Sequence, residues 1–133
     1  MDAKERIAVR GTILLVDDDE IILEACGRLL ARRGFDVLKA RNGKEAVEVF
    51  ERYQDGIGLI ILDIQMPVMD GERTYECLRQ MEPAVRVLLI SGYSETGCIE
   101  RMLQSGCKGF LQKPFDIEEL SEKIEAIQVE HYA

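Results

Sequence analysis

Residues 11–20 read GTILLVDDDE, and within them the apolar run 13–16 ends directly against Asp17, Asp18 and Asp19. A short apolar run bounded by charged residues is typical of a strand buried on both faces. Carboxylates ~4 Å apart repel by about 1 kcal/mol per pair in water, and by about 4 at the lower dielectric of a protein surface. The stretch therefore predicts a buried strand whose carboxyl end carries an acidic cluster, which a cation or shifted pKa values must compensate.

Outward from this strand, short apolar runs alternate with segments of helical periodicity. The expected strands are 13–16, 35–40, 57–62, 85–90 and 109–112. The expected helices are 20–33, 44–53, 72–81, 95–105 and 117–129. Apolar strands that alternate with helices form an open parallel sheet covered on both faces. The sequence thus predicts one α/β domain over 11–129, a doubly wound five-stranded parallel sheet with five helices, between tails at 1–10 and 130–133.

Composition excludes several classes of partner and chemistry. The formal net charge of −8 disfavours nucleic acid and anionic membrane surfaces. No apolar run is long enough to span a membrane, and the charged N-terminus MDAKERIAVRG has no signal core, so we expect a cytoplasmic protein. The single histidine, His131, lies in the last three residues, so histidine catalysis from within the chain is not expected. The cysteines form no CxxC pair, and we expect buried free thiols at Cys26, Cys77, Cys98 and Cys107.

The other predicted strands also end in polar residues. Asp63 follows the third strand, Ser91 the fourth and Lys113 the fifth. Open parallel sheets bind ligands at the carboxyl ends of their strands, so these side chains should meet the acidic cluster at one edge. A set of carboxylates suits Mg²⁺, whereas no glycine-rich loop follows the first strand to hold a nucleotide phosphate. A carboxylate beside a metal ion, a lysine and a hydroxyl can act as the nucleophile toward a phosphoryl group.

Four segments at these strand ends carry a family resemblance: LLVDDDE, LIILDIQMPVMDG, VLLISGYS and GFLQKPF. The chain resembles the receiver domains of response regulators in two-component signalling, most closely those attached to hybrid histidine kinases. The similarity runs from residue 11 to about residue 129. It implies a flavodoxin-like fold with the strand order 2-1-3-4-5.

The resemblance also implies a role for each polar residue at this edge. Asp63 would be the phosphoacceptor, and Lys113 would pair with the phosphoryl group. Mg²⁺, for which Mn²⁺ can substitute, would be bound by Asp18, Asp63 and the backbone carbonyl of Gln65, with Asp17 acting through water.

Four further residues would act after phosphorylation, again by resemblance. Ser91 and Phe110 would form a switch that alters the face made by the fourth helix, the fifth strand and the last helix. Gln65 and Tyr93 would border the approach of the hydrolysing water and set the phosphoryl lifetime. The expected partner is a histidine kinase or phosphotransfer protein bearing a phosphohistidine. A weak homodimer through the switched face is a further expectation. The chain would be no enzyme beyond catalysing its own phosphorylation and dephosphorylation.

Local signals give additional expectations. Asp19 should cap the first helix, and Gly34 should end it. Asp70 and Gly71 should shape a loop and start the third helix. The resemblance implies a cis peptide bond before Pro114.

Two alternative functions remain open from the residues alone. Asp17-x-Asp19 after an apolar strand is similar to the nucleophile motif of Mg²⁺-dependent haloacid-dehalogenase-type phosphatases. Those enzymes need a further acidic motif downstream and usually a cap domain, and Asp63 with Lys113 fits a receiver better. A pseudo-receiver that only binds partners is the second alternative, but such domains usually lose the acidic pair, the acceptor or the lysine.

Overall fold

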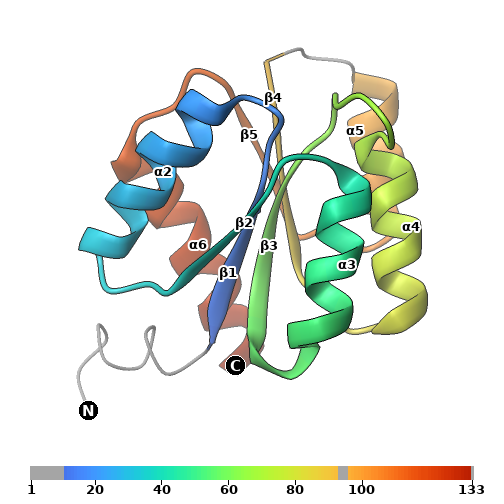
Figure 1. Cartoon of the computed structure of the whole chain (residues 1–133), viewed down its shortest axis with the longest axis horizontal. Coiled ribbons are helices and arrows are strands. Elements are labelled where there is room, and N and C mark those ends of the chain that lie inside the picture. Colours follow the sequence, from blue (N-terminus) through green and yellow to red (C-terminus); the bar gives the residue numbers. More distant parts are fainter. Residues whose placement is uncertain (1–10, 93–95, 133) are drawn as a thin grey trace.

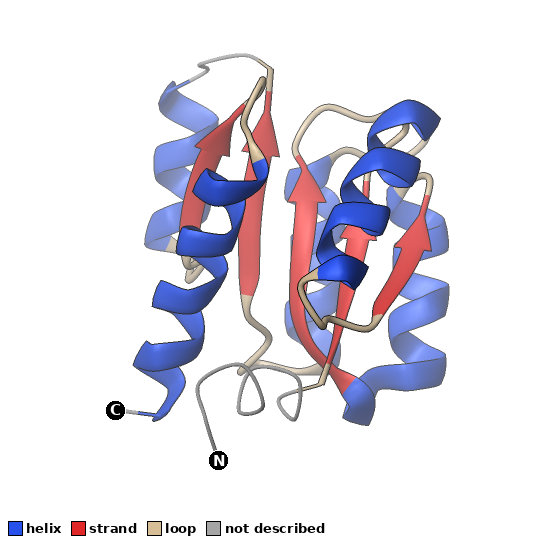
Figure 2. Cartoon of the chain, turned by 90° about the vertical axis from the view of Figure 1, so that its left-hand side faces the viewer, coloured by secondary structure: helices blue, strands red, loops and turns tan. Residues whose placement is uncertain are grey.

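The computed structural model of the chain describes residues 11–92 and 96–132. Five parallel strands form one sheet in the order β2-β1-β3-β4-β5, which confirms the predicted topology (Figure 1). The strands are β1 (Thr12–Val16), β2 (Val37–Ala40), β3 (Ile57–Asp63), β4 (Val87–Ser91) and β5 (Gly109–Gln112). Their carboxyl ends all point to the same edge of the sheet, which is where the polar residues lie (Figure 2).

Helices cover both faces of this sheet. They are α2 (Glu20–Arg32), α3 (Gly43–Tyr53), α4 (Gly71–Met81), α5 (Thr96–Gln104) and α6 (Ile117–Tyr132), with a 3₁₀ turn η1 (Gln54–Gly56) before β3. α2 and α6 pack on one face, while α3, α4 and α5 pack on the other (Figure 1). No helix among residues 11–92 and 96–132 is long and apolar enough to cross a membrane.

The first strand shows why the sheet lies between two layers. Leu14 and Val16 belong to the hydrophobic cluster under α3, α4 and α5, whereas Ile13 and Leu15 belong to the cluster under α2 and α6. All four side chains are buried, and full burial of one such side chain stabilises the fold by about 1.5–3 kcal/mol. A strand with two buried faces has no polar face, so its apolar run is continuous in the sequence.

Several boundaries differ from the sequence-based expectation for identifiable reasons. The second strand begins at Val37 because Phe35, although buried, still donates its backbone N–H to Leu30 of α2. The fourth begins at Val87 because the N–H of Val85 closes a turn onto Glu82. β3 extends to Asp63, so this residue lies within the sheet rather than after it.

The loop between β3 and α4 is closed by tight backbone packing. Gly71 donates its N–H to the carbonyl of Ile64 at 2.8 Å, and a Cβ at this glycine would lie 2.6 Å from the Ile64 Cα. Asp70 caps α4 by accepting the Arg73 N–H at 2.8 Å, as predicted. Val68 has a φ of +72°, which the sequence did not indicate and which is unfavourable for a β-branched residue. The loop that carries Gln65 is therefore held at both ends.

Other local expectations were confirmed, with one correction. Gly34 has a positive φ just after α2, and the Lys113–Pro114 bond is cis. The four cysteines are free, but only Cys26 and Cys107 are buried. The prediction of a buried thiol is wrong for Cys77 and Cys98, which are half-buried because they lie beside the buried positions of α4 and α5 rather than on them.

Candidate functional site

The carboxyl edge of the sheet gathers the polar residues that the sequence placed at strand ends. Asp17 follows β1, Asp63 and Ser91 are the last residues of β3 and β4, and Lys113 follows β5. The side chains of Asp17, Asp63 and Ser91 are almost completely buried, while Asp18 is exposed. Asp17 is fixed by its backbone, because its N–H donates to the carbonyl of Ala40 on the neighbouring strand. The sheet therefore holds the buried side of this edge in place, while the edge is open to solvent at Asp18.

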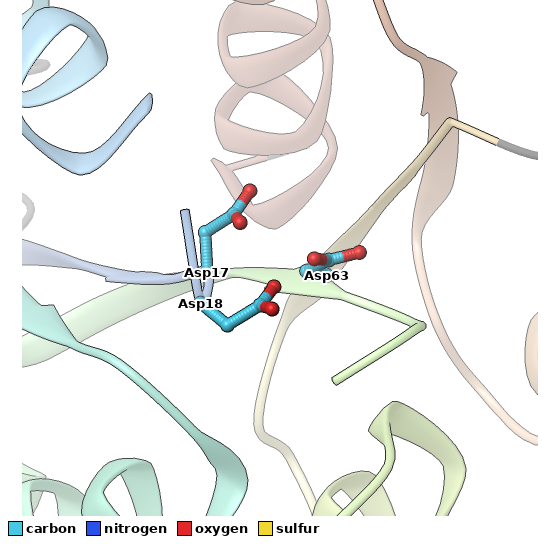
Figure 3. Close-up of side chains that lie close together, drawn as sticks. All are labelled: Asp17, Asp18 and Asp63. Carbon is cyan, nitrogen blue, oxygen red and sulfur yellow. The ribbon is translucent and has the colours of Figure 1, made fainter. Parts of the chain in front are cut away.

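Three carboxylates converge at this edge. One oxygen from each of Asp17, Asp18 and Asp63 lies within 4.8 Å of the others (Figure 3). Backbone groups orient two of them: the N–H of Asp19 donates to Asp17 Oδ1 at 2.9 Å, and that of Gln65 donates to Asp63 Oδ1 at 3.2 Å. The remaining oxygens of the buried pair face the lysine. We define these three residues as the acidic cluster.

Lys113 bridges the two buried carboxylates. Its Nζ lies 2.7 Å from Asp17 Oδ2 and 3.4 Å from Asp63 Oδ2. The backbone aims this side chain, because the N–H of Lys113 donates to the carbonyl of Ser91 at 2.8 Å. The pairing of β4 with β5 therefore fixes the backbone of Lys113, and the two ion pairs hold its ammonium.

Burial and mutual charge perturb the ionisation of this site. Burial, and secondly the charge of Asp17, raise the pKa of Asp63 to about 7, although Lys113 and the Gln65 N–H act in the opposite direction. Burial alone would lower the pKa of Lys113, but its hydrogen bond to Asp17 and the charges of both aspartates raise it overall. One ammonium does not neutralise three carboxylates, so the site retains an excess of negative charge.

The acidic cluster fits a hard divalent cation. All its donor atoms are carboxylate oxygens, and the exposed Asp18 leaves an approach from solvent. Mg²⁺ prefers oxygen ligands and retains several waters, which such a half-open site permits, and Mn²⁺ accepts the same donors. Burial, and secondly the charge of Asp17, raise the pKa of Asp63, and a bound cation would lower it again.

Asp19 lies outside the acidic cluster. Its side chain accepts the Ile21 N–H at 2.9 Å and caps α2, as the sequence predicted. The phosphatase alternative requires Asp17 and Asp19 to act together. Because Asp19 caps α2, its carboxylate does not point to the site, and this disfavours the alternative. The third carboxylate of the opening stretch is a helix cap.

Of the residues assigned to switching and lifetime, the structure describes Ser91, Phe110 and Gln65. Phe110 is half-buried and packs against the hydrophobic cluster under α3, α4 and α5, opposite Leu89 in the sheet register. Gln65 is exposed, immediately beyond β3. Tyr93 lies outside the described residues, so its position relative to Asp63 stays a prediction.

Sequence reasoning missed an apolar groove beside the lysine. The groove has a volume of about 440 Å³ and lies between α2 and the segment from β5 into α6. Its lining is Ile22, Ala25, Cys26, Leu29, Lys113, Pro114, Phe115, Asp116, Ile117 and Leu120. We call this set the α2–α6 groove. The sequence did contain a signal for the groove, because α2 has more apolar residues than it needs for one buried face. Two of them remain exposed in the structure, Leu29 by 37% and Ile21 by 79%.

Comparison with known proteins gives a consistent family. Residues 13–125 match the family model of the response regulator receiver domain. The chain is 32% identical over 113 residues to a cyclic di-GMP phosphodiesterase of Thermotoga maritima, covering 85% of this chain and 30% of that protein. The receiver domain from the hybrid histidine kinase CckA is 34% identical, with a TM-score of 0.74 over 90% of this chain and 99% of that chain.

A second solved structure is that of the CheX-CheY-BeF3-Mg²⁺ complex from Borrelia burgdorferi. It matches with a TM-score of 0.84 and 26% identity, over 88% of each chain. The chain spans less than a third of the Thermotoga relative's length, so that protein includes much that has no counterpart here. The family match over most of the sequence, the strand order and the polar carboxyl edge agree: the chain belongs to the response regulator receiver domains of two-component systems.

Proposed function

We propose that this receiver accepts a phosphoryl group on Asp63 from a phosphohistidine of a partner histidine kinase or phosphotransfer protein. The observation that carries the proposal is that the buried Asp63 carboxylate contacts an ammonium and lies within 4.8 Å of two further carboxylates, at an edge open to solvent. Figure 3 shows Asp63 beside Asp17 and Asp18, and Asp63 Oδ2 lies 3.4 Å from Lys113 Nζ.

The chemistry needs a nucleophile and compensation of charge. An oxygen of ionised Asp63 attacks phosphorus, the O–P bond forms as the N–P bond of the donor breaks, and the leaving imidazole keeps the electron pair and takes a proton. Lys113 shifts from the carboxylate toward a phosphoryl oxygen, and Ser91 donates a hydrogen bond to another. Mg²⁺, when bound, supplies positive charge to the phosphoryl oxygens.

The ligands of this metal ion would be Asp18, Asp63 and the backbone carbonyl of Gln65, with Asp17 contributing through water. The exposure of Asp18 and the convergence of the three carboxylates support this set. Asp17 is already engaged by Lys113 and by the Asp19 N–H, which favours an indirect role. Mn²⁺ would take the same place.

The phosphohistidine donor must lie outside this sequence. The single histidine, His131, lies 14 residues beyond the start of α6, which places it about 20 Å from the carboxyl edge at 1.5 Å per residue. The α2–α6 groove supports a protein partner, because it is apolar, borders Lys113 and continues onto the exposed Leu29 of α2. A partner helix seated there would bring its phosphohistidine to the edge that holds Asp63.

Phosphorylation would then be read out through Ser91 and Phe110. Movement of Ser91 toward the phosphoryl group makes room for Phe110 to turn inward, which alters the face formed by α5, β5 and α6. The half-buried position of Phe110 supports this step, since the ring is neither fully packed nor free in solvent. The same face would mediate a weak homodimer. Gln65 and Tyr93 would govern the access of the hydrolysing water and hence the lifetime. The receiver would act in the cytoplasm and catalyse no reaction beyond its own phosphorylation and dephosphorylation.

Intact mass spectrometry tests the acceptor. The parent, incubated with a small acyl phosphate and Mg²⁺, should gain one phosphoryl group that is labile to base, and Asp63→Asn should gain none. Asp19→Asn is the matched control, because it removes a neighbouring charge while asparagine still caps α2. Phosphorylation of the Asp63→Asn protein would show that the acceptor is wrong.

A further inference from the structure

The helices α4 and α5 share a hydrophobic cluster, and polar contacts also join them. Three residues of α4 take part at the spacing i, i+3, i+7, and their counterparts on the α5 side have the same spacing. The residues are Glu72, Tyr75 and Arg79 from α4, and Cys98, Arg101 and Ser105 from α5 and its C-terminal end. We call this set the polar seam. The two helices lie side by side in Figure 1.

At one end of the polar seam, Arg101 and Glu72 form a two-point ion pair, which we call the fork. Arg101 donates from Nε to Glu72 Oε2 at 3.2 Å and from Nη2 to Glu72 Oε1 at 3.3 Å. The Cys98 thiol lies 3.7 Å from the same Oε1. A two-point contact between guanidinium and carboxylate fixes relative orientation better than a single ion pair does. Glu72 is thereby committed to α5 and does not belong to the acidic cluster.

At its other end the polar seam holds the last turn of α5. The carbonyl of Ser105 accepts hydrogen bonds from the Tyr75 hydroxyl at 3.2 Å and from Arg79 Nη1 at 2.8 Å. The Arg79 guanidinium also lies over the Tyr75 ring, 5.4 Å from its centroid. Carbonyls at a helix end lack an intrahelical partner, so α4 supplies what the end of α5 needs.

Apolar burial anchors α5 less than it anchors α6. Among the described side chains of α5, Ile99 and Met102 are the buried ones, whereas α6 buries Leu120, Ile124 and Ile127. The fork is exposed on both sides, and exposed ion pairs are individually weak and reversible. Two buried apolar side chains and the weak contacts of the polar seam therefore hold α5 in place.

The position of α5 bears on the switch. Ile99 and Met102 belong to the hydrophobic cluster against which Phe110 packs, so displacement of α5 changes the room available to that ring. Ser91, at the end of β4, precedes α5 in the chain and would be drawn toward the phosphoryl group. A contact made only in the present position of α5 opposes an arrangement in which α5 is displaced, because a shift in equilibrium requires differential contacts in the two states.

We propose that the polar seam is a latch that holds α5 in the position of the unphosphorylated receiver. The proposal rests on phosphorylation of Asp63 as the signal. Coupling between two sites is reciprocal, so a receiver with an open latch must bind a phosphoryl group or its mimic more tightly. Glu72 and Arg101 are then regulatory residues, although neither touches the phosphoryl group.

Two substitutions separate a latch from simple electrostatics. Glu72→Gln and Arg101→Gln both open the fork, but they change the net charge in opposite directions. Beryllofluoride with Mg²⁺, a phosphoryl mimic, should bind about fivefold more tightly to each variant than to the parent. Glu76→Gln is the matched control, since Glu76 is an exposed α4 carboxylate whose ion pair, with Arg73, lies within the helix. It should bind like the parent.

A second measurement needs neither the mimic nor the metal ion. Amide hydrogen exchange over residues 101–105 should be faster in both variants and unchanged in Glu76→Gln, while the melting temperature stays close to that of the parent. Affinities that are unchanged, or that move in opposite directions in the two variants, overturn the latch while the parent still binds the mimic. A parent that does not bind the mimic at all overturns the proposed phosphorylation, and the latch with it.

Discussion

The Lys113 ammonium lies 2.7 Å from Oδ2 of Asp17, closer than the 3.4 Å that separates it from Asp63. Asp17 has no exposed surface, so this contact offsets part of the cost of burying its carboxylate. Lys113→Met should lower the free energy of unfolding of the metal-free protein by about 2 kcal/mol, because it strands two buried carboxylates. Urea unfolding with and without Mg²⁺ measures this. The loss should be smaller with Mg²⁺, since the cation replaces part of the missing charge.

The outcome that contradicts this prediction is a variant as stable as the parent without metal. Lys108→Met is a matched control, because Lys108 is an exposed lysine at the opposite end of β5. Its removal should change the stability by less than about 0.5 kcal/mol.

The raised pKa of Asp63 makes stability depend on pH in the metal-free protein. Its folded-state pKa is about 7 against an ordinary value of 3.8, so ionisation opposes folding. Below pH 3.8 Asp63 is protonated in both the folded and the unfolded protein, and the free energy of unfolding keeps its full value. As the pH rises from 3.8 to 7, the unfolded state gives up the proton more readily than the folded state, so the free energy of unfolding falls. Asp63→Asn should therefore be more stable than the parent at pH 8, by about 2 kcal/mol, with a gain that disappears toward pH 4.

Thermal or urea unfolding across this pH range measures the difference. A pKa raised by about three units corresponds to ~4 kcal/mol of lost stability at pH 8. We expect Asp63→Asn to recover less than this, because asparagine no longer forms the ion pair with Lys113. Asp19→Asn should show no such trend, since that carboxylate is exposed. A stability difference for Asp63→Asn that does not vary with pH would contradict the prediction.

Metal binding should depend on the exposed member of the acidic cluster. Asp18→Asn removes one ligand charge without opening a cavity, so the affinity for Mg²⁺ should fall at least about tenfold while the fold is kept. Calorimetric titration with Mg²⁺ measures the change, and Mn²⁺ should show the same loss. Asp19→Asn, one residue further along, should bind Mg²⁺ like the parent because its side chain caps α2. Equal affinities for Asp18→Asn and the parent would remove Asp18 from the metal site.

The parallel sheet and its polar carboxyl edge could be predicted from local patterns in the sequence, whereas the strand order came from the family resemblance. Apolar runs without alternation indicate buried parallel strands, and such strands place their last residues at one edge. Asp63 and Lys113 are 50 residues apart, yet the rule of strand ends brings them together. Boundaries were predicted less accurately, as at Phe35, where the end of a helix continues into residues that also have strand propensity.

The polar seam and the α2–α6 groove could not be predicted in the same way. Glu72 and Arg101 are 29 residues apart on exposed helix surfaces, where a charged residue carries no periodic signal about its partner. The groove depends on how far α2 and α6 stand apart, which the packing of whole side chains decides. Only the width of the apolar face of α2 indicated it, through residues such as Leu29.

The groove yields a prediction that separates partner docking from chemistry. Leu29→Gln adds a polar amide to the lining of the groove, and Leu103→Gln makes the same change on α5, where the leucine is also 37% exposed. Transfer should be measured from the phosphohistidine protein that phosphorylates the parent fastest in a panel of candidates. Leu29→Gln should slow it about tenfold, since burying an amide in an apolar interface costs over ~1 kcal/mol. Phosphorylation by a small acyl phosphate should be unchanged, because that donor needs the acidic cluster and Lys113 but no docking surface. An equal loss with both donors, or equal effects of Leu29→Gln and Leu103→Gln, would show that the groove is not where the partner binds.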